Sequence, residues 1–257
     1  MKVLYEDNHL LVVDKPAGMP TMGAEPGIQT VHGWATDYLK RRYQKPGNVF
    51  VGVVSRLDQL TTGVLVLART SKAASRLAIQ FGGPGKSKKV STRARKLYLA
   101  MVAGDLEKDS GLPRSGTLTD SVFKDDAAHR MRVARHPRSD AQDARLNYCV
   151  IDRSAARTLV AVRLLTGRKH QIRLQFADRG HPILGDTKYG SHSRFPHGVA
   201  LHSWRLLIEH PTKSERRLFA APLPGVWQEP PFSVPSESSI ESTLIADADW
   251  YDEESKI

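Results

Sequence analysis

The chain has 257 residues, a formal net charge of +11, 40% hydrophobic residues and 25% charged residues. These fractions are typical of a soluble globular protein that can bury a sizeable core. No stretch approaches the roughly 20 apolar residues of a membrane helix, and the charged N-terminus is unlike a signal peptide, so we expect a cytoplasmic protein with no membrane partner.

The surplus of basic residues indicates a polyanionic partner, because basic proteins bind nucleic acid by neutralising its phosphates. Residues 236–257 contain seven acids and one lysine, so the rest of the chain is more basic than the total implies. The alternative is a surface charge that only keeps the protein soluble. Cys149 is the single cysteine and has no neighbours at zinc-ligand spacing, so we expect neither an intramolecular disulfide nor a metal site.

The N-terminal part begins with two short apolar runs, at 3–5 and 10–13, which predict a pair of strands. A loop rich in proline and glycine follows over 19–30. Apolar residues then recur every three or four positions from Thr30 to Tyr43, which predicts a helix with a basic last turn.

The segment 55–63 organises this half of the chain. It places an Arg-Leu-Asp triplet, ending at Asp58, between the apolar runs 49–54 and 64–68. Both runs are short and rich in aliphatic residues, so they predict buried strands with Asp58 at their ends or in a turn over the sheet. Gly63 permits a sharp re-entry of the backbone. The alternative is an ordinary capped turn.

A helix capped by Ser71 is predicted over 71–81, and a glycine-rich stretch ends it. The following insertion, 82–96, holds six basic residues and no acid. Two interpretations of this insertion remain open: a solvated flexible loop, or an arm that follows a phosphate backbone.

The rest of the chain predicts mainly strands. Runs rich in β-branched and aliphatic residues occur at 96–102, 146–151, 158–165 and 199–208, with shorter ones at 118, 122–123 and 131–133. A helix is expected over 168–178, where His170 and Arg173 would share a face. Prolines make the chain irregular beyond Pro211, and the acidic segment 236–257 is expected to be a flexible tail.

Four stretches, in a fixed order, carry a resemblance to a known family. They are Arg56-Leu57-Asp58 with Thr61-Thr62-Gly63, Lys96-Leu97-Tyr98-Leu99-Ala100, Thr166-Gly167-Arg168-Lys169-His170-Gln171-Ile172-Arg173 and Gly180-His181-Pro182-Ile183-Leu184-Gly185-Asp186. The chain resembles the RluA-type RNA pseudouridine synthases from about Tyr5 to about Pro211. The ordered set carries this resemblance, since any one of its segments alone would be weak.

The resemblance implies an α+β catalytic domain over 1–235, with a mixed, largely antiparallel sheet, flanking helices and a basic catalytic cleft. The implied activity is the isomerisation of specific uridines to pseudouridine in structured RNA, either rRNA or tRNA. The reaction involves neither net redox change nor hydrolysis, so no cofactor and no metal are expected.

By resemblance, Asp58 is the catalytic carboxylate, Arg173 is its ion-pair partner, and Tyr98 is the aromatic residue that stacks on the target base. A fixed carboxylate suits the electron-poor C1′ that forms as the glycosidic bond breaks. Whether Asp58 attacks C1′, attacks the base or takes a ribose proton stays open. The alternatives are a core tyrosine for Tyr98 and a structural ion pair for Arg173.

Further residues are expected to contact RNA. Arg56 would fill or hold the space that the flipped-out base leaves. The other expected contacts are Arg168, His170, Gln171, Lys88, Lys89, Arg93 and Arg95. His170 has a purely structural alternative. A second basic cluster lines the substrate cleft or belongs only to the surface; it consists of Arg130, Arg132, Arg135, His136 and Arg138.

The chain departs from the family pattern at Ser55, where histidine is usual, and at Thr62, where serine is usual. These departures leave the target RNA open more than the activity. The chain lacks the S4 RNA-binding module of many relatives, and we expect a monomer. The competing classes are a non-catalytic RNA-binding protein on the same fold and a metal-independent nucleosidase or glycosidase. The catalytic set opposes the first, and the lack of a clear second carboxylate opposes the second.

Overall fold

The computed structural model describes residues 1–83 and 93–246. Most of the basic insertion, including Lys88 and Lys89, lies outside the described residues, as does the end of the acidic segment. The chain divides into two compact units, where we expected a single domain over 1–235. The first unit consists of 1–96 and 203–222, and the second consists of 97–202 and the residues from 223 on.

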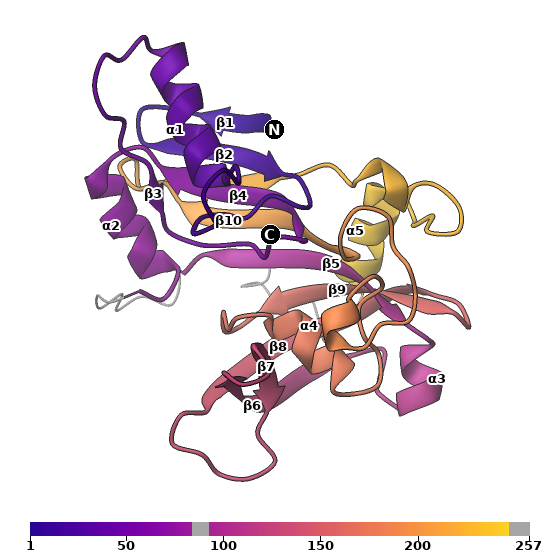
Figure 1. Cartoon of the computed structure of the whole chain (residues 1–257). Helices are drawn as coiled ribbons and strands as arrows, with labels where there is room; N and C mark the ends of the chain where they lie inside the picture. The colour runs from indigo at the N-terminus through magenta and orange to yellow at the C-terminus, as the bar shows by residue number, and fades with distance from the viewer. Residues whose placement is uncertain (84–92, 247–257) are drawn as a thin grey trace. The chain divides into compact units, whose positions relative to one another are not determined.

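The first unit contains a sheet with the strand order β1-β2-β4-β10 (Figure 1). Its strands are β1 (Lys2–Glu6), β2 (Leu10–Lys15), β3 (Gly52–Val53), β4 (Thr62–Ala68), β10 (Leu201–Glu209) and β11 (Arg216–Ala220). β3 pairs with β4 and β11 pairs with β10, both antiparallel. β2 and β4 are also antiparallel, with Lys15 opposite Gly63, so the end of β2 lies beside the start of β4.

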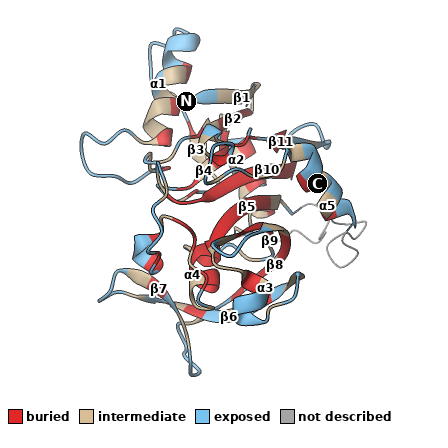
Figure 2. Cartoon of the chain, turned by 90° about the vertical axis from the view of Figure 1, so that its right-hand side faces the viewer, coloured by how far each residue is buried: buried red, intermediate tan, exposed pale blue. Residues whose placement is uncertain are grey.

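Burial of aliphatic side chains explains these strands. Residues 10–13 and 64–68 are at most 2% exposed, as expected for strands that are covered on both faces. Figure 2 shows this burial in β2 and β4. On one side, Leu77 from the helix α2 (Ser71–Gln80) packs in a cluster with Leu10 and Val66.

The two helices of the first unit begin at hydroxyl caps. Thr30 Oγ1 accepts a hydrogen bond from the Gly33 N–H at the start of α1 (Val31–Arg42), so the predicted helix over this region is confirmed. α2 is confirmed as well, but its cap is Thr70 and the prediction of Ser71 was wrong by one residue. Thr70 has the extended backbone that a cap requires, and its Oγ1 accepts from the Ala73 N–H.

The second unit contains the strand order β5-β9-β8-β6-β7, and each neighbouring pair is antiparallel. The strands are β5 (Arg95–Ala103), β6 (Ser115–Asp125), β7 (Arg130–Val133), β8 (Gln142–Arg153) and β9 (Arg157–Leu164). Its helical segments are α3 (Leu106–Ser110), α4 (Gln171–Ala177), η2 (Thr187–Tyr189), η3 (Gly225–Trp227) and α5 (Glu237–Ala246). The α+β class with a largely antiparallel sheet is therefore confirmed.

Three sequence expectations differ from the structure. The helix expected over 168–178 begins only at Gln171, because His170 is in the left-handed region with φ 55°. The acidic tail is not flexible throughout: Ile240 and Leu244, one helical turn apart, are buried and hold α5 in the second unit. The end beyond Pro211 also contains β11, a short strand that its mostly polar sequence concealed.

No helix in 1–83 or 93–246 is long and apolar enough to cross a membrane. The same residues contain no group of three or more histidine, cysteine or acidic side chains that could hold a metal ion. Cys149 is buried in β8.

Candidate active site

Asp58 lies in the connection between the antiparallel strands β3 and β4 of the first unit. The residue before it is anchored by Thr21, a buried residue of the loop that follows β2. The Leu57 N–H donates to Thr21 Oγ1 at 3.2 Å, and the Thr21 hydroxyl lies 2.9 Å from the Leu57 carbonyl oxygen. Leu57 points inward with 9% exposure, whereas Arg56 is exposed, so the loop has a defined inner and outer side.

The residue after Asp58 is anchored to the same loop. The Gly18 N–H donates to the Gln59 carbonyl oxygen at 2.9 Å, and Gln59 Nε2 donates back to the Gly18 carbonyl oxygen at 3.1 Å. The Thr61 N–H then closes a turn on the carbonyl oxygen of Asp58 at 3.1 Å. Because both neighbours of Asp58 are tied down, the backbone presents a half-buried carboxylate with little freedom of its own.

Lys15 is the cation beneath this loop. Its side chain is fully buried, and Nζ donates to the carbonyl oxygens of Pro16, Met19 and Gln59 at 2.8, 2.8 and 2.9 Å. Burial lowers the pKa of Lys15 to about 8, and the negative charge of Asp58 opposes this shift. Lys15 thus joins the loop after β2 to the loop of Asp58 through three backbone oxygens.

Sequence reasoning had treated Lys15 only as the end of a strand. The signal that could have found it is its place directly after the apolar run 10–13, where a lysine is buried only if its charge is satisfied.

Gly63 is required where the chain leaves the loop and enters β4. Its φ is +109°, and a Cβ atom there would lie 2.2 Å from the carbonyl oxygen of Ser203 in β10. The Ser203 hydroxyl donates to the Val64 carbonyl oxygen at 3.1 Å, so the two strands are held together at this point. The sequence predicted the turn at Gly63, and the structure adds the close backbone approach.

Arg173 is fixed within the second unit by Asp186. Arg173 Nε donates to Asp186 Oδ2 at 2.6 Å, and its Nη2 donates to Oδ1 at 2.7 Å. Both residues are almost fully buried, at 4% and 1% exposure. A two-point contact of this kind holds the guanidinium plane in one orientation. Asp186 follows the Gly-His-Pro segment, which sequence reasoning had assigned only a loop-fixing role.

Tyr189 connects several parts of the second unit. Its hydroxyl oxygen accepts from the Met131 N–H at 3.2 Å and lies 2.8 Å from His170 Nδ1. Because the hydroxyl keeps its own proton for Nδ1, this arrangement favours a neutral His170 with its proton on Nε2. The ring also faces the Arg173 guanidinium, 5.2 Å from its centroid. His170 is therefore oriented by tertiary contacts, since it lies outside the helix.

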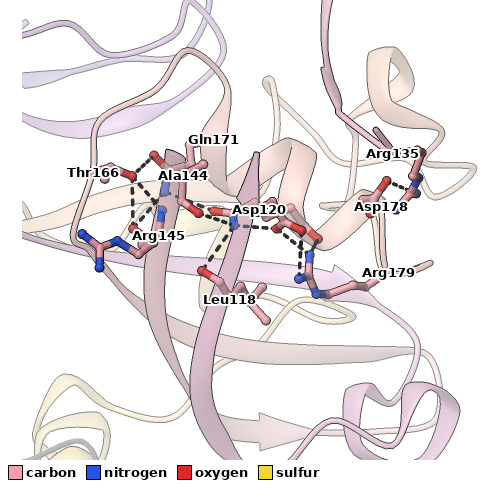
Figure 3. Close-up of polar contacts among 10 residues, drawn as sticks. Leu118, Asp120, Arg135, Ala144, Arg145, Thr166, Gln171, Asp178 and Arg179 are labelled. Carbon is pink, nitrogen blue, oxygen red and sulfur yellow. Dashed lines mark hydrogen bonds and ion pairs between the residues drawn. The ribbon is translucent and has the colours of Figure 1, made fainter. Parts of the chain in front are cut away.

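Gln171 organises the turn that precedes α4 (Figure 3). Its Oε1 accepts from the Thr166 hydroxyl at 2.8 Å and from the Arg168 N–H at 3.0 Å. Its Nε2 donates to the Arg145 carbonyl oxygen and to Gln175 Oε1. Gln171 is 3% exposed and internally committed, so the structure supports a positioning role for it. Arg168 is half-buried and donates from Nε to the carbonyl oxygen of Asp143 at 2.8 Å.

A second group of contacts fixes α4 to the sheet (Figure 3). Gln175 Nε2 donates to Asp120 Oδ2 of β6 at 2.7 Å, and Arg179 donates to the same carboxylate at 2.9 Å. Figure 2 shows α4 as buried, and six of its seven residues are. The helix that carries Arg173 is thus held from both of its ends.

The remaining predicted residues are distributed between the units. Tyr98 is 5% exposed on β5, opposite Val162 of β9. Asp58 and Arg56 belong to the first unit, whereas Tyr98 and Arg173 belong to the second. Of the basic insertion, Arg93 is exposed and Arg95 lies in β5; the prediction for Lys88 and Lys89 lies outside the described residues.

The chain belongs to the RNA pseudouridylate synthase family, whose sequence profile matches residues 9–178. It is 35% identical over 234 residues to the ribosomal large subunit pseudouridine synthase D of Nitrosomonas europaea, an alignment that covers 87% of this chain and 62% of the relative. It is 34% identical over 226 residues to the uncharacterized RNA pseudouridine synthase YhcT of Bacillus subtilis, covering 88% and 69%. The chain thus spans less than two thirds of the first relative.

Solved structures agree with this family at the level of the fold. The human RNA pseudouridylate synthase domain containing 1 aligns with a TM-score of 0.68 and 22% identity, over 96% of this chain and 95% of its own. The human domain containing 4 aligns with a TM-score of 0.67 and 23% identity, over 86% and 88%. These similarities confirm the predicted fold class.

Proposed function

We propose that this protein isomerises uridine to pseudouridine in RNA, with Asp58 as the catalytic carboxylate. The observation that carries the proposal is the anchoring of the Asp58 loop on both sides, through Thr21 and through Lys15 with Gly18. A buried cation and a set of backbone hydrogen bonds are spent on holding one carboxylate in place. Such preorganisation is what a catalytic group needs and an ordinary surface turn does not.

The chemistry assigns different tasks to three residues. The reaction breaks the bond between uridine N1 and ribose C1′, turns the base, and rejoins it to C1′ through C5, with loss of the C5 proton. Asp58 acts on the sugar or the base while C1′ is electron-poor. Tyr98 stacks on the target base, and Arg173, with its plane fixed by Asp186, pairs with the catalytic carboxylate.

The proposed substrate class is large-subunit ribosomal RNA, with transfer RNA as the alternative. The names of the relatives and the net charge of +11 support an RNA substrate. The target base must leave its stack to reach Asp58, and the exposed Arg56 on the same loop is suited to hold the vacated space. We further propose that Arg168, Arg93 and Arg95 contribute contacts to the RNA, and that the protein acts as a cytoplasmic monomer.

Release of tritium from C5-labelled uridine tests the proposal. The substrate is bulk RNA from a strain that lacks this gene, and the proteins are wild type, Asp58→Asn and Asp37→Asn. Asp37 is an exposed residue of α1, so its variant controls for the loss of one negative charge. We expect release by wild type and Asp37→Asn, and none by Asp58→Asn.

Two other outcomes would reject the proposal. RNA binding by wild type without tritium release would favour a non-catalytic RNA-binding protein on this fold. Equal release by wild type and Asp58→Asn would remove Asp58 from the catalytic role. Mapping the labelled positions in large-subunit rRNA and in tRNA then decides the substrate class.

A further inference from the structure

The second unit contains a cavity of about 630 Å³ between the β6–β7 hairpin, the segment that follows β7, and α4. Its volume lies within the range of roughly 300–1,000 Å³ that is usual for small-ligand sites. The lining combines guanidinium groups with aromatic and aliphatic side chains. The lining residues used here are Phe123, Arg130, Met131, Arg135, Arg138 and Tyr189. This mixture is suited to a ligand with both a flat ring and a negative charge.

Carboxylates hold two of the arginines in defined positions. Arg138 Nε and Nη2 donate to the two carboxylate oxygens of Asp140, at 2.9 and 3.0 Å. Arg135 Nη2 donates to Asp178 Oδ1 at 2.6 Å. A guanidinium has five N–H donors, so each of these arginines retains donors for a ligand.

Arg130 differs from the other arginines of the cavity. Within 1–83 and 93–246 its side chain makes no hydrogen bond or ion pair, and it feels Asp125 only through a longer-range charge interaction. It is half-buried at the start of β7. Since the charge of a partly buried arginine is best satisfied by an anion, Arg130 marks the place where the cavity would take one.

Arg138 and Phe123 form a flat surface in the same cavity. The Arg138 guanidinium carbon lies 3.8 Å from the centroid of the Phe123 ring. Unpaired RNA bases stack on aromatic rings and on guanidinium planes of this kind. Buried Met131 and Leu174 add apolar surface beside them. A nucleobase fits this chemistry better than a plain anion does, because an anion would leave the apolar surface unused.

Tyr189 links the cavity to the proposed active site. It lines the cavity, and its ring also faces the guanidinium of Arg173. The cavity is therefore separated from the proposed catalytic arginine by a single side chain. A polynucleotide with its target uridine near Arg173 would have a neighbouring nucleotide within reach of the cavity.

We propose that this cavity binds an unpaired nucleotide of the RNA substrate that lies close to the target uridine. The base stacks against Arg138 and Phe123, and the phosphate binds Arg130 and Arg135. This inference rests on the proposed function, because the RNA must be the substrate of the Arg173 site. It gives the second basic cluster a defined task, selecting which uridines have a flippable neighbour, that the catalytic residues alone do not perform.

Salt-dependent binding tests the two kinds of contact separately. The probe is a fluorescein-labelled transcript of large-subunit rRNA, read by fluorescence anisotropy from low to moderate salt. Arg130→Gln should weaken binding and flatten the plot of log K against log salt by about 0.7, the contribution of one phosphate contact to a single strand. Phe123→Leu should weaken binding about tenfold, the effect of losing one stacked base, without changing the slope.

Arg153→Gln is the matched control. Arg153 is exposed at the end of β8, pairs with Glu107, and does not line the cavity, and its variant loses the same charge as Arg130→Gln. If Arg130→Gln and Arg153→Gln have the same affinity and the same slope, the cavity does not hold a phosphate and the inference is overturned.

Ultraviolet crosslinking in the wild-type protein gives a readout that does not depend on a variant folding. We expect nucleotide adducts on the peptide that contains Phe123 or on the one that contains Tyr189. If RNA-bound protein shows adducts only elsewhere, the inference fails even when tritium release is normal. If adducts form at Phe123 but Asp58→Asn releases tritium as wild type does, the proposed catalytic role fails and the nucleotide site stands.

Discussion

Arg173 and Asp186 form a two-point ion pair inside the second unit, with both side chains at most 4% exposed. Breaking a buried pair by removing one charge typically costs about 3–5 kcal/mol, because the remaining charge is left unpaired. The pair therefore does more than fill the core: it fixes the plane of the guanidinium that we assign to the catalytic carboxylate.

We predict that Asp186→Asn lowers the free energy of unfolding by about 3 kcal/mol and reduces kcat much more than it raises KM. The reason is that the amide keeps the shape of Asp186 but loses the charge that orients Arg173. Urea unfolding and tritium release check both effects. Glu107→Gln is the control, since it breaks a partly exposed ion pair and should cost no more than about 1 kcal/mol. An Asp186→Asn protein with unchanged kcat would show that Asp186 has no positioning role.

The Gly63 position is predicted to tolerate no side chain. Gly63→Ala adds a Cβ atom 2.2 Å from a backbone oxygen at a φ of +109°, so β4 and β10 cannot keep their spacing. We expect a loss of several kcal/mol or a failure to accumulate folded protein, measured by thermal unfolding and soluble yield. Gly47→Ala is the matched control, because its added Cβ would meet nothing within 4 Å. Equal stability of the two variants would contradict the proposed packing.

Lys15 is predicted to make stability depend on alkaline pH. Burial lowers its folded pKa to about 8 from an ordinary value of 10.5. Between these pH values the unfolded chain binds more protons than the folded chain, so the free energy of unfolding should rise with pH. We expect the wild type to gain stability relative to Lys15→Met from pH 7 to pH 10 in urea titrations. Lys72→Met, at an exposed position of α2, should show no such trend.

The same substitution should affect catalysis. Lys15→Met removes the donor to the Gln59 carbonyl oxygen beside Asp58, so kcat should fall on the order of tenfold, the equivalent of about 1.4 kcal/mol. Tritium release at pH 7 measures it. Wild-type kcat in a folded Lys15→Met protein would mean that the Asp58 loop does not depend on this anchor.

Asp7 is predicted to contribute stability that is lost in acid. Although burial raises its pKa, hydrogen bonds from the His9 and Leu10 N–H groups, His210 and Tyr5 lower it well below the ordinary value of 3.8. The stabilisation is therefore complete above about pH 4 and is lost as pH falls toward the folded pKa. Asp7→Asn should be less stable than wild type at pH 7, and the difference should shrink at pH 3. Asp37→Asn, at an exposed position, should match wild type at both.

Local sequence signals determined much of the fold. The hydroxyl of Thr30 and the apolar spacing that follows it define α1, because capping and helical periodicity act within a few residues. The strands β2, β4, β8 and β9 were likewise readable as short apolar runs. α5 was not, because its two buried residues, Ile240 and Leu244, are diluted by serines and acids and acquire meaning only when a surface covers them.

For the candidate site, the order of motifs in the sequence identified Asp58, Tyr98 and Arg173, because the chemistry constrains residue types at fixed spacing. Only the tertiary structure decided what holds them. Lys15 meets Gln59 across 44 positions, and Tyr189 meets Met131 across 58. Contacts between residues so far apart leave no periodic signal in the sequence, since they depend on how the strands between them are paired. The sequence alone therefore named the reacting groups, and the fold determined their anchors.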